Sequence, residues 1–473
     1  MHDKTSESSG STRKFGRRGF LTAVAAGAGG LGLGTALAPY EERVAYATRN
    51  VNRNSAPSSL KITDLRVAVL DEVPFTSPIV RIDTNQGISG YGEVRDDADP
   101  RYALMLKSRL LGQNPTSVEK LFAGIQQFGG HGRQGGGVSG VEMALWDLAG
   151  KAFGVPVYQM IGGKYRDDVR LYTDTAASQD PAVYARRMKE KVDREGFTFL
   201  KMDVGIELVK DIPGALTGAG AWGDLEQYSG KPGSYGMTEH PFTRIQITDK
   251  GLDEIAKYYE AVRNAVGYEI PLGSDHFGHF GVNEAIKLSE RMAPYNLAYM
   301  EDLVPWFHTD MWKEISRATT VPTMTGEDIY GLEDFKPLID ERAVDLVHPD
   351  IASAGGIMPT KEIGDYAAEN GIAMFLHYAG SPIGAMASAH VAVASHNFVA
   401  LENHSAEVEF WDDLVTGVEK PLVRKGFYRI PDGPGLGVEL NEEAARQHLK
   451  KGTELFPPSD QWNESGSWDR TWS

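Results

Sequence analysis

Five acidic or imidazole side chains recur at nearly even intervals through the second half of this 473-residue chain. Each follows a short apolar segment, and successive members lie 26, 26, 23 and 27 positions apart: Asp275, Glu301, Glu327, Asp350 and His377. One strand, one helix and two short loops of an α/β barrel need about 25–30 residues. Each of the five is therefore expected at the carboxyl end of a successive parallel strand. All five would then converge on one mouth of the barrel, where the active sites of this fold lie.

Strand and helix patterns alternate from about residue 169 onward. Apolar strands are expected to end near Thr173, Asp203, Asp275, Glu301, Glu327, Asp350, His377 and Glu402. Eight strands with seven intervening helices predict an α/β fold, a modified (β/α)8-type barrel of the form (β/α)7β, over residues 169–409. Residues 60–168 instead indicate a small antiparallel sheet followed by helices, which together form an α+β capping domain. The C-terminal segment, 410–473, is expected to pack on this cap and complete it.

The N-terminal residues are typical of an export signal. A basic stretch that includes Arg17 and Arg18 precedes the uncharged, glycine-diluted residues 20–38, and Ala45-Tyr46-Ala47 is a plausible cleavage site. We interpret residues 1–47 as a twin-arginine signal peptide, followed by a linker over 48–59. This predicts a periplasmic or extracellular protein without stable membrane insertion after cleavage. The alternative is an uncleaved anchor, because nineteen uncharged residues are nearly long enough to span a bilayer.

Composition limits the kinds of ligand and partner. The chain has 48 basic and 65 acidic residues, a net charge of −17, which argues against a nucleic-acid partner. It contains no cysteine, so a metal would be held by oxygen or imidazole ligands. Three carboxylates on adjacent strands make a hard, oxygen-rich site, for which Mg²⁺ is the natural occupant and Mn²⁺ a substitute. A single acid at a strand end is more often structural, but four acids and one histidine in register are a stronger signal.

Local motifs across about residues 60–460 resemble the mandelate racemase-type branch of the enolase superfamily. These motifs include Gly-Tyr-Gly-Glu at 90–93, Val-Glu-Met-Ala-Leu-Trp-Asp at 141–147, Lys-Met-Asp at 201–203, His-Pro-Asp at 348–350 and Leu-Glu-Asn-His at 401–404. The resemblance implies a homo-oligomer with Mg²⁺ bound by Asp275, Glu301 and Glu327. It also implies removal of a proton α to a carboxylate, through a metal-stabilised enediolate.

The same resemblance assigns the other site residues. His377 is the expected base and Asp350 the residue that orients its ring. Glu402 corresponds to the acid that hydrogen-bonds the substrate carboxylate, and it would have to be protonated to donate that bond. Lys201 is expected to offset negative charge near that carboxylate. The usual opposite-face base, a second lysine, is replaced here by Asp203, which could act as a base or could instead bridge Lys201.

This substitution bears on the reaction. A racemase needs a competent base on each face of the substrate, whereas a dehydratase can work from one face. His377 could take the α-proton and then return a proton to the departing β-hydroxyl. The sequence therefore predicts a Mg²⁺-dependent hydro-lyase that dehydrates a sugar acid, a small-molecule carboxylate, to a 2-keto-3-deoxy acid. No organic cofactor is expected.

Two alternative functions and the role of one long insertion are also considered. The first alternative is a racemase, epimerase or cycloisomerase on the same scaffold, and the second is a non-catalytic sugar-acid-binding protein. Residues 205–247 form a glycine-rich insertion on the active-site side, expected to act as a lid or as an oligomer contact. We interpret His276 as structural, His279 as able to reach the site from its loop, and His404 as a weaker candidate.

Overall fold

The computed structural model describes residues 55–217, 246–275 and 280–464. The predicted signal peptide, most of the linker, residues 218–245 of the insertion, and both His276 and His279 lie outside the described residues. The two ends of the insertion pair as antiparallel strands, β6 (Leu216–Thr217) with β7 (Gln246–Ile247). Across the described ranges, no helix combines the length and apolar character needed to cross a membrane.

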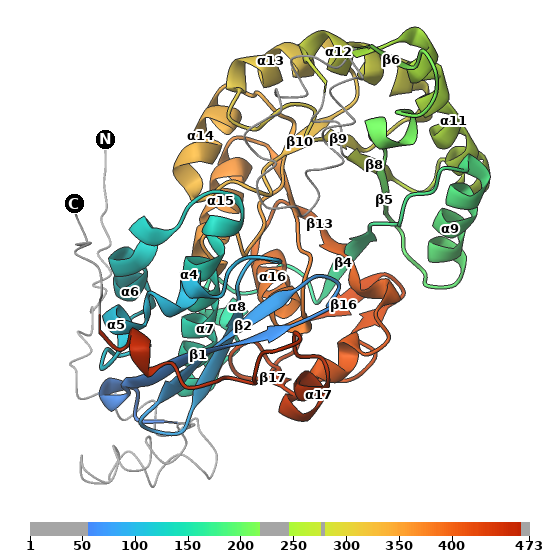
Figure 1. Cartoon of the computed structure of the whole chain (residues 1–473). Helices are drawn as coiled ribbons and strands as arrows, with labels where there is room; N and C mark the ends of the chain where they lie inside the picture. Colours follow the sequence, from blue (N-terminus) through green and yellow to red (C-terminus); the bar gives the residue numbers. More distant parts are fainter. Residues whose placement is uncertain (1–54, 218–245, 276–279, 465–473) are drawn as a thin grey trace, which may run out of the picture. The chain divides into compact units, whose positions relative to one another are not determined.

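Eight parallel strands close into a barrel (Figure 1). In chain order they are β4 (Asp168–Thr173), β5 (Leu200–Asp203), β8 (Leu272–Asp275), β9 (Tyr299–Glu301), β10 (Thr323–Thr325), β11 (Leu346–Val347), β12 (Ala373–Leu376) and β13 (Phe398–Asn403). Each pairs with the next along the chain, and the last strand, β13, pairs with the first, β4. The predicted fold class is confirmed.

Helices connect successive strands and cover the outside of the barrel. They are α9 (Pro181–Asp193), α11 (Asp249–Val266), α12 (Val282–Met292), α13 (Thr309–Ala318), α14 (Leu332–Asp340), α15 (Ile357–Glu369) and α16 (Pro382–Ala394). The periodic apolar pattern over 251–266 does form a helix, because Leu252, Ile255, Tyr259 and Val262 bury one face of α11. Seven such helices among the described residues give the form (β/α)7β.

Aromatic rings fill the barrel interior directly beneath the mouth. Tyr172, Phe199, Tyr299 and Phe375 pack as one buried cluster, with ring centroids 5.2–6.3 Å apart. Gly273 on β8 makes room for this layer, since a Cβ atom there would lie 2.2 Å from Tyr299 Cζ. The layer gives the functional side chains above it a rigid, water-excluding base.

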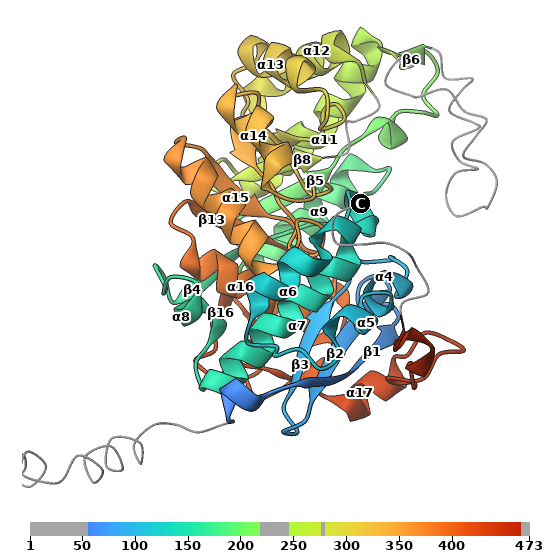
Figure 2. The same cartoon turned by 90° about the vertical axis from the view of Figure 1, so that its left-hand side faces the viewer.

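The cap is a three-stranded antiparallel sheet covered on one face by helices (Figure 2). Its strands are β1 (Ile62–Leu70), β2 (Ser77–Thr84) and β3 (Ser89–Glu93). Its helices are α4 (Arg101–Leu104), α5 (Lys107–Leu110), α6 (Val118–Ile125), α7 (Gly136–Phe153) and α8 (Val157–Met160). Helix α7 lies closest to the sheet because Gly92 faces it, where a Cβ atom would stand 2.0 Å from the Gly140 carbonyl oxygen.

Two buried carboxylates fix the cap to the barrel. Glu93, at the end of β3, accepts hydrogen bonds from the Ser381 and Gly384 N–H groups at the start of α16, at 2.9 and 3.2 Å. Glu142 on α7 accepts bonds from the first N–H groups of α15, Ile357 at 2.6 Å and Met358 at 3.0 Å. Helix N-termini carry unsatisfied donors and partial positive charge, so carboxylates are suited to this position. These two motif residues therefore join the domains in this structure.

The C-terminal segment contacts both the cap and the barrel. Its elements are β14 (Val415–Thr416), β15 (Val423–Arg424), β16 (Phe427–Arg429), β17 (Glu439–Leu440) and α17 (Glu442–Gln447). Figure 1 shows α17 and β17 beside the cap strands, where Arg81 pairs with Glu442 at 2.9 Å. The β15–β16 hairpin instead extends the barrel sheet, because β16 pairs antiparallel with β4.

Candidate active site

Strand register brings the predicted Lys201 and Asp203 to the barrel mouth. In the parallel β5–β8 pair, Asp203 lies opposite Asp275, and Lys201 lies two residues deeper, opposite Gly273. Lys201 is buried, and its Nζ atom lies 2.9 Å from Asp275 Oδ2 and 2.6 Å from Glu402 Oε1. Its cationic group is thus fixed between Asp275 and Glu402.

The three predicted metal ligands stand at the ends of adjacent strands, and Glu301 is central among them. Carboxylate oxygens of Asp275, Glu301 and Asp302 lie within 4.8 Å of one another, and a second such group joins Glu301 and Glu327 with His348. His348 Nδ1 hydrogen-bonds Glu301 Oε1, whereas the other oxygen of Glu301, Oε2, is buried without a hydrogen-bond partner among the described residues. Lys201 Nζ lies 3.8 Å from this oxygen, beyond hydrogen-bond distance, so the oxygen can still bind a cation.

The electrostatics of these acids also favour a cation. Burial and the neighbouring Asp275 carboxylate raise the pKa of Glu301 well above its usual value, although Lys201 opposes the shift. A cluster of buried carboxylates that is hard to ionise alone becomes stable once a divalent ion neutralises it. The donor set of carboxylate oxygens without sulfur fits Mg²⁺.

His377 and Asp350 form a hydrogen-bonded pair on two neighbouring strands. His377 Nδ1 lies 2.6 Å from Asp350 Oδ2, while Asp350 Oδ1 accepts the N–H groups of Ala352 and Ser353 at 2.6 and 3.0 Å. The other ring nitrogen, Nε2, faces the site and lies 3.1 Å from Glu327 Oε2. Arg95 Nη1 also lies 3.0 Å from His377 Nδ1, so these contacts fix the orientation of the ring and leave Nε2 as the nitrogen that faces the site.

The charge around His377 favours its protonated form. Burial lowers the pKa of His377, but the carboxylate of Glu327 and, more weakly, that of Glu402 raise it to a net value of about 10. A cation that neutralises Glu327 would weaken this effect and lower the pKa of the ring. The base strength of His377 is therefore linked to the occupancy of the carboxylate cluster.

Arg95 is a site residue that the sequence did not reveal. It follows β3 of the cap, is 2% exposed, and points into the barrel mouth. Its guanidinium pairs with Asp350 Oδ2 at 2.7 Å, with Asp96 Oδ1 at 2.8 Å and with Glu327 Oε1 at 3.4 Å. Burial raises the pKa of Asp350, yet Arg95 and the His377 hydrogen bond hold it below the usual value. A residue of the cap therefore helps to keep the orienting carboxylate ionised.

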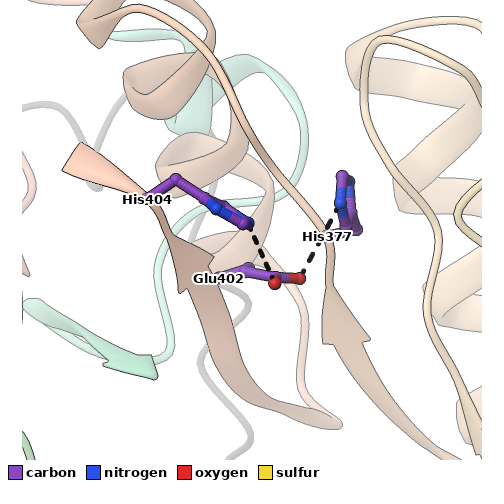
Figure 3. A group of neighbouring side chains, drawn as sticks. All are labelled: His377, Glu402 and His404. Atoms are coloured by element: carbon purple, nitrogen blue, oxygen red, sulfur yellow. Dashed lines mark hydrogen bonds and ion pairs between the residues drawn. The ribbon is translucent and has the colours of Figure 1, made fainter. Parts of the chain in front are cut away.

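Glu402, on β13, lies between two imidazole rings (Figure 3). His404 Nε2 is 3.0 Å from its Oε1, and His377 Nε2 is 3.9 Å from its Oε2. The Tyr172 hydroxyl also donates to Oε2, at 2.8 Å. Burial raises the pKa of Glu402, but the positive charges of Lys201 and His377 outweigh burial and hold it well below the usual value. The ionised form of Glu402, which these charges favour, cannot donate a hydrogen bond. The bond that Glu402 was expected to donate to a substrate carboxylate therefore stays a prediction.

Asp203 lies near a second carboxylate, Asp174, which follows β4. Burial and the charge of Asp203 raise the pKa of Asp174 to about 7. The Asp203 backbone is held by Tyr184, whose hydroxyl accepts its N–H at 2.8 Å. The ion pairs of Lys201 described above are with other acids, and both roles considered for Asp203 stay open.

The structure also brings into the site His404, a weaker candidate above, and His348, which was named above only within the His-Pro-Asp motif. Each lies two residues from a predicted site residue, His404 after Glu402 and His348 before Asp350. Side chains two apart on an extended segment share a side, so the signal was present in the sequence.

A small cavity opens beside the carboxylate cluster. Its volume is about 330 Å³, and it lies between the segments that follow β9 and β10. The lining includes Asp302, Thr325, Glu327, Asp328, Trp306 and Phe307. A lining of acidic, hydroxyl and aromatic groups suits a small hydroxylated ligand.

Comparison with known proteins decides the family. Residues 46–162 match the family described as mandelate racemase / muconate lactonizing enzyme, N-terminal domain, and residues 183–444 match enolase C-terminal domain-like. The chain belongs to the enolase superfamily. A crystal structure of a mandelate racemase/muconate lactonizing enzyme-like protein from Rubrobacter xylanophilus superposes with a TM-score of 0.72 at 30% identity, over 84% of this chain and 100% of that one.

Two curated relatives have names that refer to sugar-acid dehydratases. A D-xylonate dehydratase of Haloferax volcanii is 33% identical over 84% of this chain and 90% of its own. A D-galactonate dehydratase family member of Pseudarthrobacter chlorophenolicus is 30% identical over 79% and 93%. The predictions of an enolase-superfamily member and of a hydro-lyase enzyme are confirmed.

Proposed function

We propose that this enzyme is a Mg²⁺-dependent dehydratase of an aldonic-type sugar acid. The observation that carries the proposal is the convergence at one mouth of Lys201, the Glu301-centred carboxylates and the His377–Asp350 pair. The dehydratase relatives named for D-xylonate and D-galactonate support a substrate of this class. The cavity of about 330 Å³ suits a small hydroxylated chain, with acids to accept hydrogen bonds from its hydroxyls.

Asp275, Glu301 and Glu327 are the residues that would hold Mg²⁺. When bound there, the ion neutralises negative charge that develops on the substrate carboxylate. Lys201 offsets the same charge from its buried position between Asp275 and Glu402. His377 Nε2 takes the proton from C2, and Asp350 stabilises the imidazolium that results. The C2–H electrons pass to the carboxylate as an enediolate.

The second half of the reaction expels the β-hydroxyl. The enediolate electrons form the C2–C3 double bond as the C3–O bond breaks. The departing oxygen takes a proton from an imidazolium at the mouth and leaves as water. The enol then becomes the 2-keto-3-deoxy acid without oxidation or reduction of the substrate.

A screen of the purified chain against pentonates and hexonates tests this function. With Mg²⁺ present, at least one acid should yield a 2-keto-3-deoxy acid, detected as its semicarbazone. If no keto acid forms while deuterium from D₂O enters C2 of a substrate, the racemase or epimerase hypothesis replaces the dehydratase. Tight binding with neither signal would favour a non-catalytic sugar-acid-binding protein.

We also propose export by the twin-arginine route, on the basis of the Arg17-Arg18 pair and the uncharged residues 20–38. Cell fractionation of the host strain compares the natural chain with the double variant Arg17→Lys, Arg18→Lys. The natural chain should appear outside the cytoplasm in a shortened form, and the variant should remain inside at full length. Equal distribution of both would refute the proposal.

The expected homo-oligomer also stays a prediction. Light scattering of the purified chain would test it.

A further inference from the structure

The site contains a second histidine–aspartate pair that the mechanism above leaves unused. His404 follows β13 and Asp174 follows β4, the two strands whose pairing closes the barrel. His404 Nδ1 lies 3.7 Å from Asp174 Oδ2, and its Nε2 lies 3.0 Å from Glu402 Oε1. The placement on two neighbouring strands resembles the first pair, in which His377 follows β12 and Asp350 follows β11, but 3.7 Å is an ion-pair distance, whereas His377 and Asp350 are hydrogen-bonded at 2.6 Å. Glu402 stands between the two pairs, as Figure 3 shows for the two rings.

The two imidazoles are close enough to act on one substrate. Their ring centroids are 6.3 Å apart, and one nitrogen of each lies within 4.8 Å of the other and of a Glu402 oxygen. A proton-transfer group needs about 3 Å to its target atom. Two nitrogens at this separation can therefore reach the hydrogen on C2 and the hydroxyl on C3 of the same molecule.

We propose that His404, positioned by Asp174, is the general acid that protonates the departing C3 hydroxyl. His377 removes the C2 proton, and the enediolate electrons form the C2–C3 double bond. The C3–O bond breaks with its electron pair on oxygen, which takes the proton from His404 and leaves as water. His404 ends neutral and His377 ends protonated, so one proton must pass from His377 to solvent and one from solvent to His404 per turnover. The inference rests on the proposed dehydratase function.

The surroundings of His404 support this role. Burial lowers the pKa of His404, but Glu402 and Asp174 outweigh burial and raise it, which favours the proton-carrying form. Its side chain is 17% exposed, whereas that of Glu402 beneath it is fully buried. The ring of Phe75, on the cap segment between β1 and β2, contacts the His404 ring edge-on, with centroids 5.9 Å apart. Lys201 already pairs with Glu402, so the charge of Glu402 is compensated without His404.

The test separates leaving-group protonation from the first step. His404→Asn is assayed beside His377→Asn, with His396→Asn, which removes an exposed histidine, as the matched control. Three rates are measured: keto-acid formation, deuterium entry at C2 of recovered substrate in D₂O, and fluoride release from the 3-deoxy-3-fluoro analogue. Fluoride needs no general acid to leave.

The expected pattern is specific to His404. His404→Asn should lower keto-acid formation by about 10²–10⁴-fold, the usual contribution of a general acid. It should retain C2 exchange and fluoride release, whereas His377→Asn loses all three and His396→Asn none. Asp174→Asn should share the pattern of His404→Asn in weaker form.

Two results would overturn the inference. Keto-acid formation by His404→Asn at the wild-type rate would mean that His377 returns the proton itself. Loss of all three signals in His404→Asn would mean that the ring only supports Glu402. If the wild type itself shows neither keto acid nor exchange with any acid sugar, the proposed function is refuted. This outcome differs from the two results above, which concern only the His404→Asn variant.

Discussion

Replacing Arg95 by methionine tests how the cap contributes to the barrel site. The guanidinium is 2% exposed and pairs with Asp350, Asp96 and Glu327. Removing one partner of a buried ion pair usually costs about 3–5 kcal/mol, because the remaining charge is left buried. Here Asp96 keeps Arg133 at 2.8 Å, and Asp350 keeps His377 and two backbone N–H groups. We therefore expect the lower end, a loss of about 3 kcal/mol in the free energy of unfolding.

Urea unfolding of the wild type and Arg95→Met measures this loss. Arg101→Met is the matched control, because Arg101 is 73% exposed and pairs only with Asp99 among the described ion pairs, so no measurable change is expected. In the activity assay, kcat of Arg95→Met should fall more than KM rises, since Arg95 contacts the orienting pair. A stability loss below about 1 kcal/mol, the range of surface ion pairs, would refute the reasoning.

Three further predictions concern a second base, acid stability and the packing of the cap. Asp203→Asn should leave dehydration largely intact if His377 is the sole base for C2, and loss of C2 exchange in this variant would instead identify Asp203 as that base. His390 is buried and accepts the Tyr158 N–H at 3.1 Å; burial lowers its pKa to about 4. Because the ordinary pKa of histidine is about 6.5, the unfolded chain protonates His390 at a higher pH than the folded chain does. This difference lowers the free energy of unfolding by about 3 kcal/mol as the pH falls from about 6.5 to 4. His390→Gln should flatten that part of the curve of unfolding free energy against pH, and an unchanged slope would contradict the assignment. Gly92→Ala would bring a methyl group within 2.0 Å of a carbonyl oxygen of α7 and should cost about 1–3 kcal/mol by urea unfolding. Gly124→Ala meets open space in a helix and should be neutral or stabilising, so equal losses in the two variants would refute the packing argument.

The barrel and its strand-end residues were predictable because both depend on local repetition. Each strand of a parallel barrel ends at the same face, so regular spacing alone placed Asp275, Glu301, Glu327 and His377 at one mouth. Alternation along an extended strand also places Lys201 and Asp203 on one side of β5. These inferences need only the period of one strand–helix unit and the geometry of an extended chain.

Residues that reach the site from another domain were not predictable in this way. Arg95 is 255 positions from Asp350, and only the docking of the cap brings the two together. The roles of Glu93 and Glu142 also depend on that docking, although both belong to motifs that are visible in the sequence. His404 could have been found, because it lies two residues beyond Glu402 on the same side of the strand. Its partner Asp174, however, is adjacent only because the barrel closes.

The most direct measurement is the rate of 2-keto-3-deoxy acid formation from the best substrate, for the wild type and for His377→Asn, each with Mg²⁺ and with EDTA. We expect keto acid only from the wild type with Mg²⁺, and its recovery when Mg²⁺ is restored after chelation. Because His377 takes the C2 proton, His377→Asn should also show no deuterium entry at C2. Formation of keto acid by His377→Asn at the wild-type rate, or an unchanged rate in EDTA, would contradict the proposed mechanism.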